Sequence, residues 1–431
     1  MSPEPDEIAD LICVGFGPAS LAIGIALQDL NLSSRQKVTF LERQPKFAWH
    51  AGMQIPGAKM QISFLKDLAT PRNPRSHFTF INYLWSKGRL NTFINLDTFT
   101  SSRQEYEDYL RWCASHFEAQ GLVSYSENVE DVMPVKSPSG LVTSFIVNSR
   151  NLLTGRIVAR KARHVVIAVG GKPNLPSEFP QNNSQVVHSS QYGKQVGKAL
   201  PDKQKAYNIA VVGNGQSAAE ILNNLPFRYP NAKVTMIIKQ SALRPSDDSP
   251  FVNEVFDPER VDTTFKQEAN KRKAAILLDK ATNYGVVRIG LLQHLYETLY
   301  MQRLSSENPK DWPINILNNR CTTSVTPLAD GSLKLQLRKV QDDGTDSNEP
   351  EEIKVDAVFV ATGYVRDAHE NMLCRTRDLL APQYRNDKVK FPVKRDYSVE
   401  FEAGKVRSDA GIWLQGCNEM THGVGLFLRL S

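Results

Sequence analysis

Several patterns that define common protein classes are missing from this 431-residue chain. None of its five cysteines belongs to a C-x-x-C pair, which argues against a thiol–disulfide oxidoreductase and favours reduced thiols in a reducing compartment. No uninterrupted apolar run reaches the roughly 18 residues that a membrane-spanning helix needs. We therefore expect a cytoplasmic protein that contacts no membrane.

Charge of one sign is not concentrated anywhere, although the net charge is +6. Without a basic block or arm, nucleic acid is a poor candidate partner, while a mild positive excess suits anionic cofactors. No catalytic triad or metal-binding cluster stands out. Residues 1–10 are acidic, and Gly-Phe-Gly-Pro interrupts the apolar run 11–27, so we expect no secretion signal.

The stretch "DLICVGFGPAS" near the N-terminus predicts a strand, a tight turn and a helix. Gly15 permits the turn, Gly17 lets the backbone approach a pyrophosphate, and Ser20 replaces the third glycine of G-x-G-x-x-G. The next strand, "KVTFLERQ", ends at Glu42, which can accept hydrogen bonds from ribose hydroxyls. This combination predicts a dinucleotide with its phosphates at the helix N-terminus. The alternative is a tight turn without a ligand.

A second stretch, "NIAVVGNGQSAAE", repeats this pattern with Gly213, Gly215 and Ala218. The following strand, "AKVTMIIKQ", ends at Lys239, which would attract the 2′-phosphate of NADP where a carboxylate would repel it. The alternative reading of Lys239 is a solvated strand end. Two turns with opposite terminal charges imply FAD on the first and NADPH on the second, with hydride passing between them.

The pattern of elements predicts an α/β fold with two Rossmann-like dinucleotide-binding domains, the second inserted into the first, plus a small helical substrate-binding part. Both domains are expected to be doubly wound parallel sheets, with the strand "VDAVFVATGY" closing back onto the FAD domain. "VVIAVGG" is expected to be its matching earlier strand. We place the FAD-binding domain in 1–200 and 326–431, and the NADPH-binding domain in 201–325, with the helical part at about 250–310.

Long motifs resemble those of the N-hydroxylating flavin monooxygenases, specifically the fungal L-ornithine N5-monooxygenases of siderophore biosynthesis, a route of iron acquisition. The resemblance runs from about Asp10 to Gly423, nearly the whole chain. It is carried by "VGFGPASLA", "WHAGMQI", "MQISFLKDLATPRNPRSHFTFINYL", "GNGQSAAE", "RPSDDSPFVNE", "KATNY", "VATGY" and "GIWLQGCNEMTHG".

The resemblance implies FAD- and NADPH-dependent N5-hydroxylation of L-ornithine by O₂. In this family the reduced flavin forms a C4a-hydroperoxyflavin, which oxidised NADP shields, and the neutral side-chain amine of ornithine attacks it. The protein mainly positions the reactants and excludes water. The resemblance also implies a homotetramer.

Site residues follow from the same resemblance. For the substrate it implies Lys66, which would pair with the α-carboxylate, and Asn253, Glu254, Val255, Phe256 and Asn283. For FAD it implies Gly15, Gly17, Pro18, Ala19, Ser20, Glu42, Arg43, Gln44, Pro45, Lys46, Phe47, Ala48, Trp49, His50, Gln61, Val129 and Leu428. For NADP it implies Asn214, Gly215, Gln216, Ser217, Lys239, Asn283, Tyr284 and Gly285.

Simpler readings stand beside these assignments. Lys66-Asp67 is also typical of a surface pair, Asn253 of a helix cap, Asn283-Tyr284 of a turn, and Trp49-His50 of a core pair.

The last residues depart from the family pattern. After Thr-His-Gly the family continues with a pattern like Leu-Ser-Asp-Ser-Leu-Leu-Ser and a further helix, whereas this chain reads "THGVGLFLRLS". Aligned without gaps, Leu428 falls on a leucine beside the flavin, and Leu430 falls on a substrate-contacting serine. An apparently truncated relative that is inactive or binds cofactor weakly is therefore an alternative.

Other flavin monooxygenases are further alternatives. A lysine N6-hydroxylase belongs to the same broad class. A Baeyer–Villiger enzyme is disfavoured, because its F-x-G-x-x-x-H fingerprint is not met by Phe179 and His188, whose spacing is wrong and whose glycine is missing.

Overall fold

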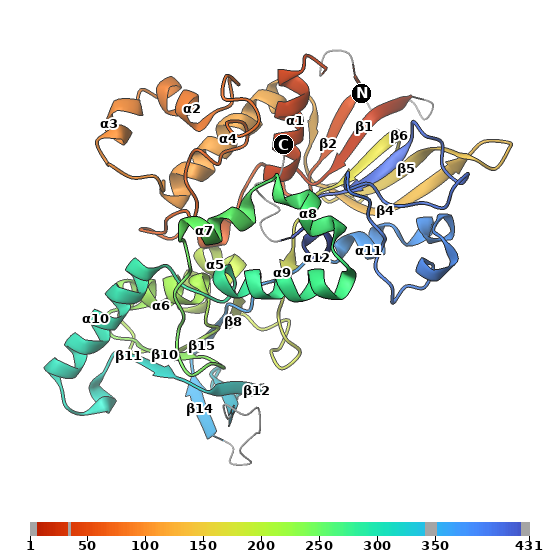
Figure 1. Cartoon of the computed structure of the whole chain (residues 1–431). Coiled ribbons are helices and arrows are strands. Elements are labelled where there is room, and N and C mark those ends of the chain that lie inside the picture. The colour runs from red at the N-terminus through yellow and green to blue at the C-terminus, as the bar shows by residue number, and fades with distance from the viewer. Residues whose placement is uncertain (1–6, 33–35, 341–350, 424–431) are drawn as a thin grey trace.

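The computed structural model describes residues 7–32, 36–340 and 351–423 (Figure 1). Its first sheet has the order β3-β2-β1-β6-β5-β4, with β17 also pairing with β6. The strands are β1 (Ile8–Val14), β2 (Val38–Leu41), β3 (Val123–Ser124), β4 (Glu127–Lys136), β5 (Val142–Asn151), β6 (Ile157–Ile167) and β17 (Gly411–Leu414). This sheet and the helices packed on it are called the first unit below.

The first sheet is mixed, so the expectation of a purely parallel sheet is wrong. Strands β4, β5 and β6 pair antiparallel, whereas β1, β2, β3, β6 and β17 run parallel to their neighbours. The short connections 137–141 and 152–156 explain this difference. A parallel crossover needs about a dozen residues or more, so these connections can form only hairpins.

The second sheet is entirely parallel, in the order β11-β10-β9-β15-β8. Its strands are β8 (Val186–His188), β9 (Asn208–Val212), β10 (Lys233–Ile237), β11 (Ile314–Leu317) and β15 (Ala357–Val360). This sheet and the elements that cover it are called the second unit.

Strand β15 is the "VDAVFVATGY" strand, and its predicted return to the first sheet is wrong. It pairs with β9 and β8, while β17 is the strand that returns to β6. The second sheet thus takes β8 and β15 from outside 201–325. The chain crosses between the sheets at β7 (Lys172–Pro173) and β16 (Tyr364–Val365), which pair with each other.

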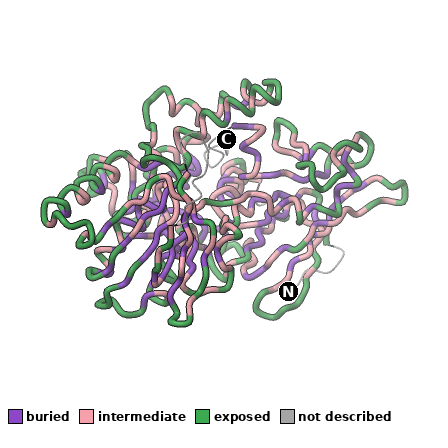
Figure 2. Tube along the Cα trace, turned by 90° about the horizontal axis from the view of Figure 1, so that it is seen from below, coloured by how far each residue is buried: buried purple, intermediate pink, exposed green. Residues whose placement is uncertain are grey.

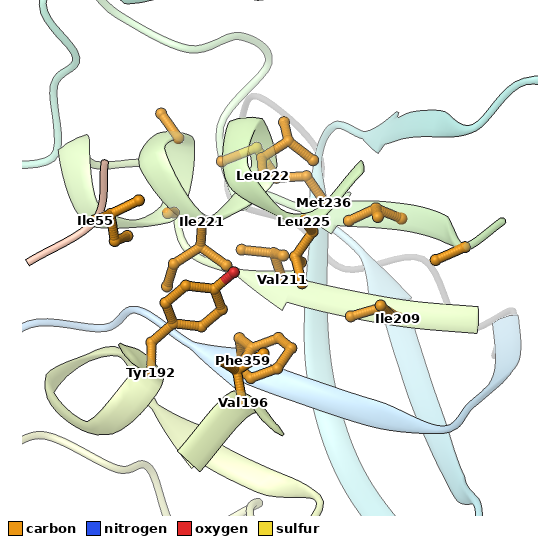
Figure 3. Close-up of a cluster of buried hydrophobic side chains, with 14 of the residues drawn as sticks. Ile55, Tyr192, Val196, Ile209, Val211, Ile221, Leu222, Leu225, Met236 and Phe359 are labelled. Carbon is orange, nitrogen blue, oxygen red and sulfur yellow. The ribbon is translucent and has the colours of Figure 1, made fainter. Parts of the chain in front are cut away.

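The second sheet has different layers on its two faces. Side chains of a strand alternate between faces, so Val211 and Phe359 pack with α5 (Tyr192–Ala199), α6 (Gln216–Arg228) and α10 (Ile289–Ser305), as Figure 3 shows in part. Ala210 and Val358 pack instead against a three-stranded antiparallel sheet of β12 (Arg320–Pro327), β13 (Leu333–Lys339) and β14 (Glu351–Val355). A sheet therefore covers the face where a doubly wound fold would place helices.

The first sheet is also covered on both faces. Helices α1 (Pro18–Asp29), α2 (Phe80–Ser86) and α4 (Arg103–Ala119) pack on the face of Cys13 and Phe40. Leu373, Leu379 and Phe391 of the returning chain pack on the other face. Figure 2 shows buried residues gathered along the strands of both units.

Except for the 15-residue α9, the remaining helices are short, and the α7–α9 segment lies between the two sheets in Figure 1. They are α3 (Leu90–Ile94), α7 (Pro250–Asn253), α8 (Arg260–Lys266), α9 (Ala269–Asn283), α11 (Ala368–Met372) and α12 (Glu419–His422), with 3-10 turns η1 (Ala51–Met53), η2 (Ser189–Gln191), η3 (Glu254–Phe256), η4 (Pro309–Asp311), η5 (Cys374–Leu379) and η6 (Pro382–Tyr384). Among the described residues, no helix combines the length and apolarity needed to cross a bilayer.

Candidate functional site

The first glycine turn joins β1 to α1 and is closed by close backbone contact. Gly15 has φ +92°, and a Cβ there would lie 2.6 Å from the carbonyl oxygen of Ala168. Ser20 Oγ donates to the Gly15 carbonyl at 2.6 Å, which gives a physical role to the serine at the third glycine position. Gly17 caps α1 without a side-chain hydrogen bond, and no atom lies within 4 Å of its Cβ direction. Free helix N–H groups beside open space fit a pyrophosphate.

Glu42 follows the end of β2 and faces this turn. Its Oε2 accepts from the Phe16 N–H at 2.7 Å, and its Oε1 accepts from the Gln44 N–H at 2.8 Å. The carboxylate therefore ties the turn to β2. An ionised carboxylate offers about four acceptor sites, so Glu42 retains capacity for a ribose hydroxyl.

The stretch 42–50 divides between core, cavity and surface. Phe47 is buried against Phe16, with ring centroids 6.1 Å apart, and Gln44 Nε2 donates to the Ala48 carbonyl at 3.0 Å. Four residues of this stretch are exposed: Arg43, Pro45, Lys46 and His50.

Two further predicted FAD residues lie apart from this stretch. Val129 is buried in β4 beside a bulge in the pairing with β5. Leu428 lies outside the described residues.

The second glycine turn joins β9 to α6 in the same way. Gly213 has φ +132°, and a Cβ there would lie 2.5 Å from the Ala361 carbonyl oxygen. Gly215 caps α6 without a side-chain hydrogen bond. Asn214 Nδ2 donates to the Gly285 carbonyl at 3.0 Å, which brings together two predicted NADP segments. Lys239 lies on the surface after β10, with no ion pair inside the described ranges.

Both turns open on one cavity of about 320 Å³. Pro18 contributes to its wall from the first turn, and Gln216 and Ser217 contribute from the second. The wall also includes Trp49, His50, Gln61, Asp67, Arg103, Tyr106 and Tyr364. A larger groove of about 800 Å³ runs along α10 and β11, but its lining includes no residue of either turn. We therefore take the smaller cavity as the candidate site.

His50 is a neutral side chain at this cavity. Part of the residue is exposed to solvent, but protein atoms crowd around the ring and bury much of it. This burial lowers the pKa of His50 to about 4, and the positive charges of Arg103 and Arg366 contribute to the lowering. His50 thus adds hydrogen-bonding capacity without charge at neutral pH.

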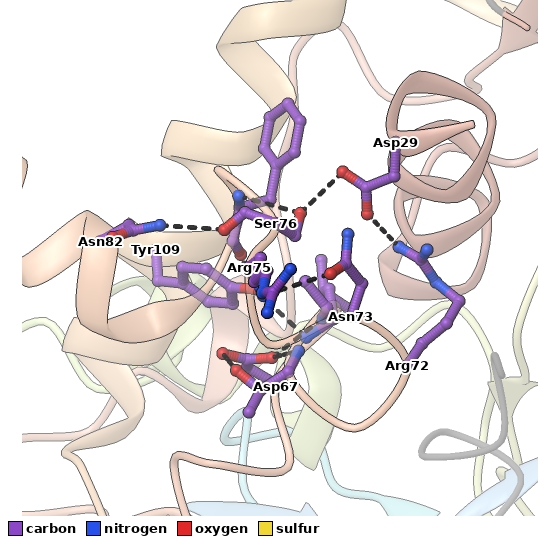
Figure 4. A network of polar contacts seen from close by, with 12 residues as sticks. Asp29, Asp67, Arg72, Asn73, Arg75, Ser76, Asn82 and Tyr109 are labelled. Carbon is purple, nitrogen blue, oxygen red and sulfur yellow. Dashed lines mark hydrogen bonds and ion pairs between the residues drawn. The ribbon is translucent and has the colours of Figure 1, made fainter. Parts of the chain in front are cut away.

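Lys66 lies at the start of a rigid loop. Asp67 is buried and accepts from the backbone N–H groups of Ala69 at 2.9 Å, Thr70 at 2.6 Å and Phe80 at 2.6 Å (Figure 4). The reading of Lys66-Asp67 as a surface pair therefore fails. Lys66 Nζ lies 5.6 Å from the centre of the Phe256 ring, so the structure brings together the two predicted substrate segments.

The polar side chains of the predicted substrate segments partly serve local structure. Asn253 Nδ2 donates to the Asp248 carbonyl at 2.9 Å, and Asn283 Nδ2 donates to Thr282 Oγ1 at 2.6 Å. Glu254 is exposed and lies 3.7 Å from Arg260. Val255 is half-buried beside it.

Sequence reasoning missed several charged residues that shape the site. Arg103 forms two hydrogen bonds with Glu220, at 2.7 and 2.8 Å, across the two units. Tyr284 donates to Glu419, which also binds Lys280 and Arg366. The sequence did contain a signal for these contacts. Asp67, Glu220 and Glu419 are acidic residues inside the quoted motifs, and an acidic side chain that becomes buried needs a charged or hydrogen-bonding partner.

Comparisons with known proteins agree with this geometry. The family profile described as L-lysine 6-monooxygenase/L-ornithine 5-monooxygenase matches residues 7–366. An L-ornithine N(5)-monooxygenase of Cochliobolus heterostrophus is 53% identical over 97% of this chain and 83% of its own length. The ornithine hydroxylase PvdA from Pseudomonas aeruginosa superposes with a TM-score of 0.86 at 35% identity, covering 98% of this chain and 97% of that one.

A second solved structure is the ornithine N-hydroxylase KtzI from Kutzneria sp. 744, described with reduced FAD, NADP⁺ and L-ornithine. It has a TM-score of 0.86 at 31% identity and covers 98% of this chain and 96% of that one. The chain belongs to the L-lysine 6-monooxygenase/L-ornithine 5-monooxygenase family.

Proposed function

We propose that this chain is an FAD- and NADPH-dependent L-ornithine N5-monooxygenase, which uses O₂ and begins hydroxamate siderophore biosynthesis. The shared cavity carries the proposal, because Pro18 of one glycine turn and Gln216 and Ser217 of the other line the same space. Dinucleotides bound at the two turns would meet there. Family membership and the ligands of the Kutzneria relative support the same reaction.

The residues present fit both cofactors. Each turn ends in a glycine that caps a helix without a side-chain hydrogen bond, so each presents free N–H groups to a pyrophosphate. Glu42 at the first turn suits a ribose, and the positive Lys239 after the second suits a 2′-phosphate. The FAD, NADP and substrate residues predicted from the sequence are part of this proposal, except Leu428, which lies outside the described residues.

The side chains at the cavity bind and orient, as the chemistry requires. When bound, the flavin supplies the redox chemistry, with two electrons from NADPH and one oxygen atom of O₂ entering the product while the other leaves as water. Lys66, next to the cavity-lining Asp67, would hold the α-carboxylate of ornithine. Trp49 and Tyr106, with ring centroids 5.7 Å apart, form an aromatic wall that limits water. His50 donates or accepts hydrogen bonds there as a neutral group.

The proposal is tested by purifying the protein, recording its flavin absorbance, and measuring hydroxylamine product and NADPH oxidation. We expect bound flavin and a hydroxylated product from L-ornithine, with much less from L-lysine. Product from lysine alone would indicate the related N6-hydroxylase. A protein that retains no flavin when FAD is supplied would contradict the proposal.

The proposal also covers the oligomeric state of the protein and the cellular compartment in which it works. The groove along α10 is lined by Tyr296, Tyr300 and Trp312 together with leucines, and Tyr296 is 76% exposed. We propose that further copies of the chain cover this apolar surface in a homotetramer, which light scattering would detect. All five cysteines are unpaired, which suits the reducing cytoplasm.

A further inference from the structure

Glu419 is a buried carboxylate at the start of α12, five residues after the end of the returning strand β17. Its Oε2 lies 2.7 Å from Lys280 Nζ, and its Oε1 lies 2.6 Å from Arg366 Nη1. The hydroxyl of Tyr284 also donates to Oε1. One carboxylate thus forms ion pairs with two cations and accepts a hydrogen bond from a phenol.

The three partners come from two segments of the chain. Lys280 lies in α9, Tyr284 caps the C-terminus of the same helix, and Arg366 follows β16, where the chain crosses back to the first unit. Glu419 itself is tied to the first sheet through its neighbour Asn418, whose Nδ2 donates to the Leu414 carbonyl of β17 at 2.6 Å. The cluster therefore fastens the end of α9 to both the crossover and the first sheet.

Electrostatics keep this carboxylate ionised. Burial alone would raise the pKa of Glu419, but hydrogen bonds from Lys280 and Tyr284 and the charge of Arg366 outweigh it and lower the pKa. Burial and the neighbouring Glu419 raise the pKa of Tyr284 to about 12, so the phenol remains a donor. The contacts are therefore charge-assisted, which makes them stronger than neutral hydrogen bonds.

The fastened segment is the one that faces the second turn. Gly285, next to Tyr284, accepts the hydrogen bond from Asn214, and a Cβ on Gly215 would lie 3.5 Å from the Gly285 Cα. Asn283, on the other side of Tyr284, is a proposed ligand of both substrate and NADP. A shift of Tyr284 would move both neighbours.

We infer that Glu419 is a positioning residue, which holds Asn283, Tyr284 and Gly285 in register with the second turn and the substrate. This inference rests on the proposed function for the ligands, but the geometry of the cluster does not depend on it. Glu419 acts through Tyr284 and Lys280 and need not touch either ligand. Loss of its charge should loosen the end of α9 and weaken the binding of both NADP and the substrate.

The test compares Glu419→Gln with a matched control, Glu127→Gln. Glu127 is also a buried carboxylate, and its pKa is lowered: burial opposes the lowering, and hydrogen bonds from Ser149 and Asn151 and the charge of Arg160 cause it. It lies in the β4–β5–β6 part of the first sheet, apart from α9. Glu419→Asp keeps the charge with a shorter reach and should recover part of the effect.

Three readouts are measured on the FAD-loaded protein. Glu419→Gln should increase hydrogen exchange of residues 276–286 without any added ligand. It should weaken the binding of NADP⁺ and of L-ornithine, measured by calorimetric titration, by about tenfold or more, because charge-assisted hydrogen bonds are stronger than neutral ones. It should also lower the hydroxylated product formed per NADPH. Glu127→Gln should lower the unfolding midpoint and leave all three readouts unchanged.

The outcomes separate this inference from the proposed function. If Glu419→Gln lowers stability alone, with exchange at 276–286 and both affinities as in the unmodified protein, the inference is wrong. Equal loss of affinity in Glu127→Gln would also overturn it. If the unmodified protein does not hydroxylate ornithine, the proposed function fails, while the exchange and NADP⁺ measurements still decide the role of Glu419.

Discussion

At the scale of single residues, the loop around Lys66 shows how a buried acid frees a neighbouring cation. The carboxylate of Asp67 accepts hydrogen bonds from N–H groups of its own loop and from the hydroxyl of Thr70, 2.8 Å away. Within the described residues, Lys66 has no carboxylate at ion-pair distance, and its ammonium faces Phe256. A positive group held by a rigid loop and left without an anion suits an incoming carboxylate.

The first prediction concerns this ammonium. Lys66→Gln removes the charge and leaves a polar side chain that is one atom shorter. We expect the KM for L-ornithine to rise about 10- to 100-fold, because a hydrogen bond to a charged group contributes about 1.5–3 kcal/mol. Steady-state kinetics with the exposed Lys87→Gln as control measures this. An unchanged KM in Lys66→Gln would remove Lys66 from the substrate site.

The second prediction concerns the choice between NADPH and NADH. Lys239→Glu replaces the positive charge after β10 with a negative one, which would repel a 2′-phosphate. We expect the ratio of kcat/KM for NADPH to that for NADH to fall about tenfold or more. Lys198→Glu, on the exposed side of α5, makes the same charge change elsewhere and should leave the ratio unchanged. A ratio that does not move in Lys239→Glu excludes it as the phosphate partner.

The third prediction uses the lowered pKa of His50. The folded protein protonates His50 only near pH 4, whereas an unfolded histidine protonates near its ordinary value of 6.5. Between these values the unfolded state binds more protons, so His50 lowers the free energy of unfolding as the pH falls from 6.5 to 4. His50 has φ +45°, which asparagine tolerates, so His50→Asn is the matched change.

Urea denaturation of the cofactor-free protein at pH 7 and pH 5 measures this effect. His50→Asn should lose less stability between the two pH values than the unmodified protein does. An identical loss in both proteins would show that His50 does not titrate differently on folding.

At the scale of elements, each glycine turn contains one glycine that the fold requires and one that the ligand requires. Gly15 has positive φ and no room for a Cβ beside Ala168. Gly17 has φ −95°, which other residues adopt, and open space around it. The two positions therefore separate folding from FAD binding.

The fourth prediction follows from this difference. Gly15→Ala should destabilise the cofactor-free protein by at least about 1–2 kcal/mol, from left-handed strain alone. Gly17→Ala should leave the stability of the cofactor-free protein unchanged. It should weaken FAD binding by about tenfold or more, because the added methyl group fills the space through which the pyrophosphate approaches the backbone. Thermal unfolding and flavin fluorescence titration measure the two effects. Equal FAD affinity in Gly17→Ala would show that no phosphate lies against this turn.

Patterns within one stretch of sequence predict the elements around these turns but not how distant strands pair. Glycine spacing and apolar runs predicted both strand–turn–helix units, and the structure has β1–α1 and β9–α6 there. Strand β15 is buried on both faces, as an inner parallel strand of either sheet would be, so its sequence could not select its sheet.

Ser20 and Glu220 show the same limit within the site. Ser20 departs from the glycine pattern of the sequence, and its hydrogen bond to the Gly15 carbonyl, which only the folded structure shows, gives the reason. Glu220 pairs with Arg103, 117 residues away, and nothing local in the sequence identifies that partner.

At the scale of the whole molecule, polar contacts fix how the two units lie together around the cavity. Arg103 at the start of α4 reaches Glu220 in α6, and Arg288 Nη1 donates to the Met60 carbonyl at 2.7 Å. The side chains of Arg103 and Glu220 are only 13% and 5% exposed. Arg103 lines the cavity together with Pro18 of the first turn and Gln216 of the second, so we expect these contacts to fix the distance between the two cofactor sites.

The last prediction tests this ion pair with a double-mutant cycle. Glu220→Leu leaves the Arg103 guanidinium buried without its anion, and Arg103→Met does the same to the carboxylate, so each should cost about 3–5 kcal/mol of stability. The double variant places two apolar side chains together and should recover most of the loss, because a buried pair replaced by apolar residues is often neutral. Denaturant unfolding measures the four proteins. Effects that simply add would show that the two side chains do not stabilise each other.

If the pair also fixes the orientation of the units, the double variant should fold but couple NADPH oxidation to hydroxylation less efficiently, because apolar contact does not impose the direction that two charged hydrogen bonds impose.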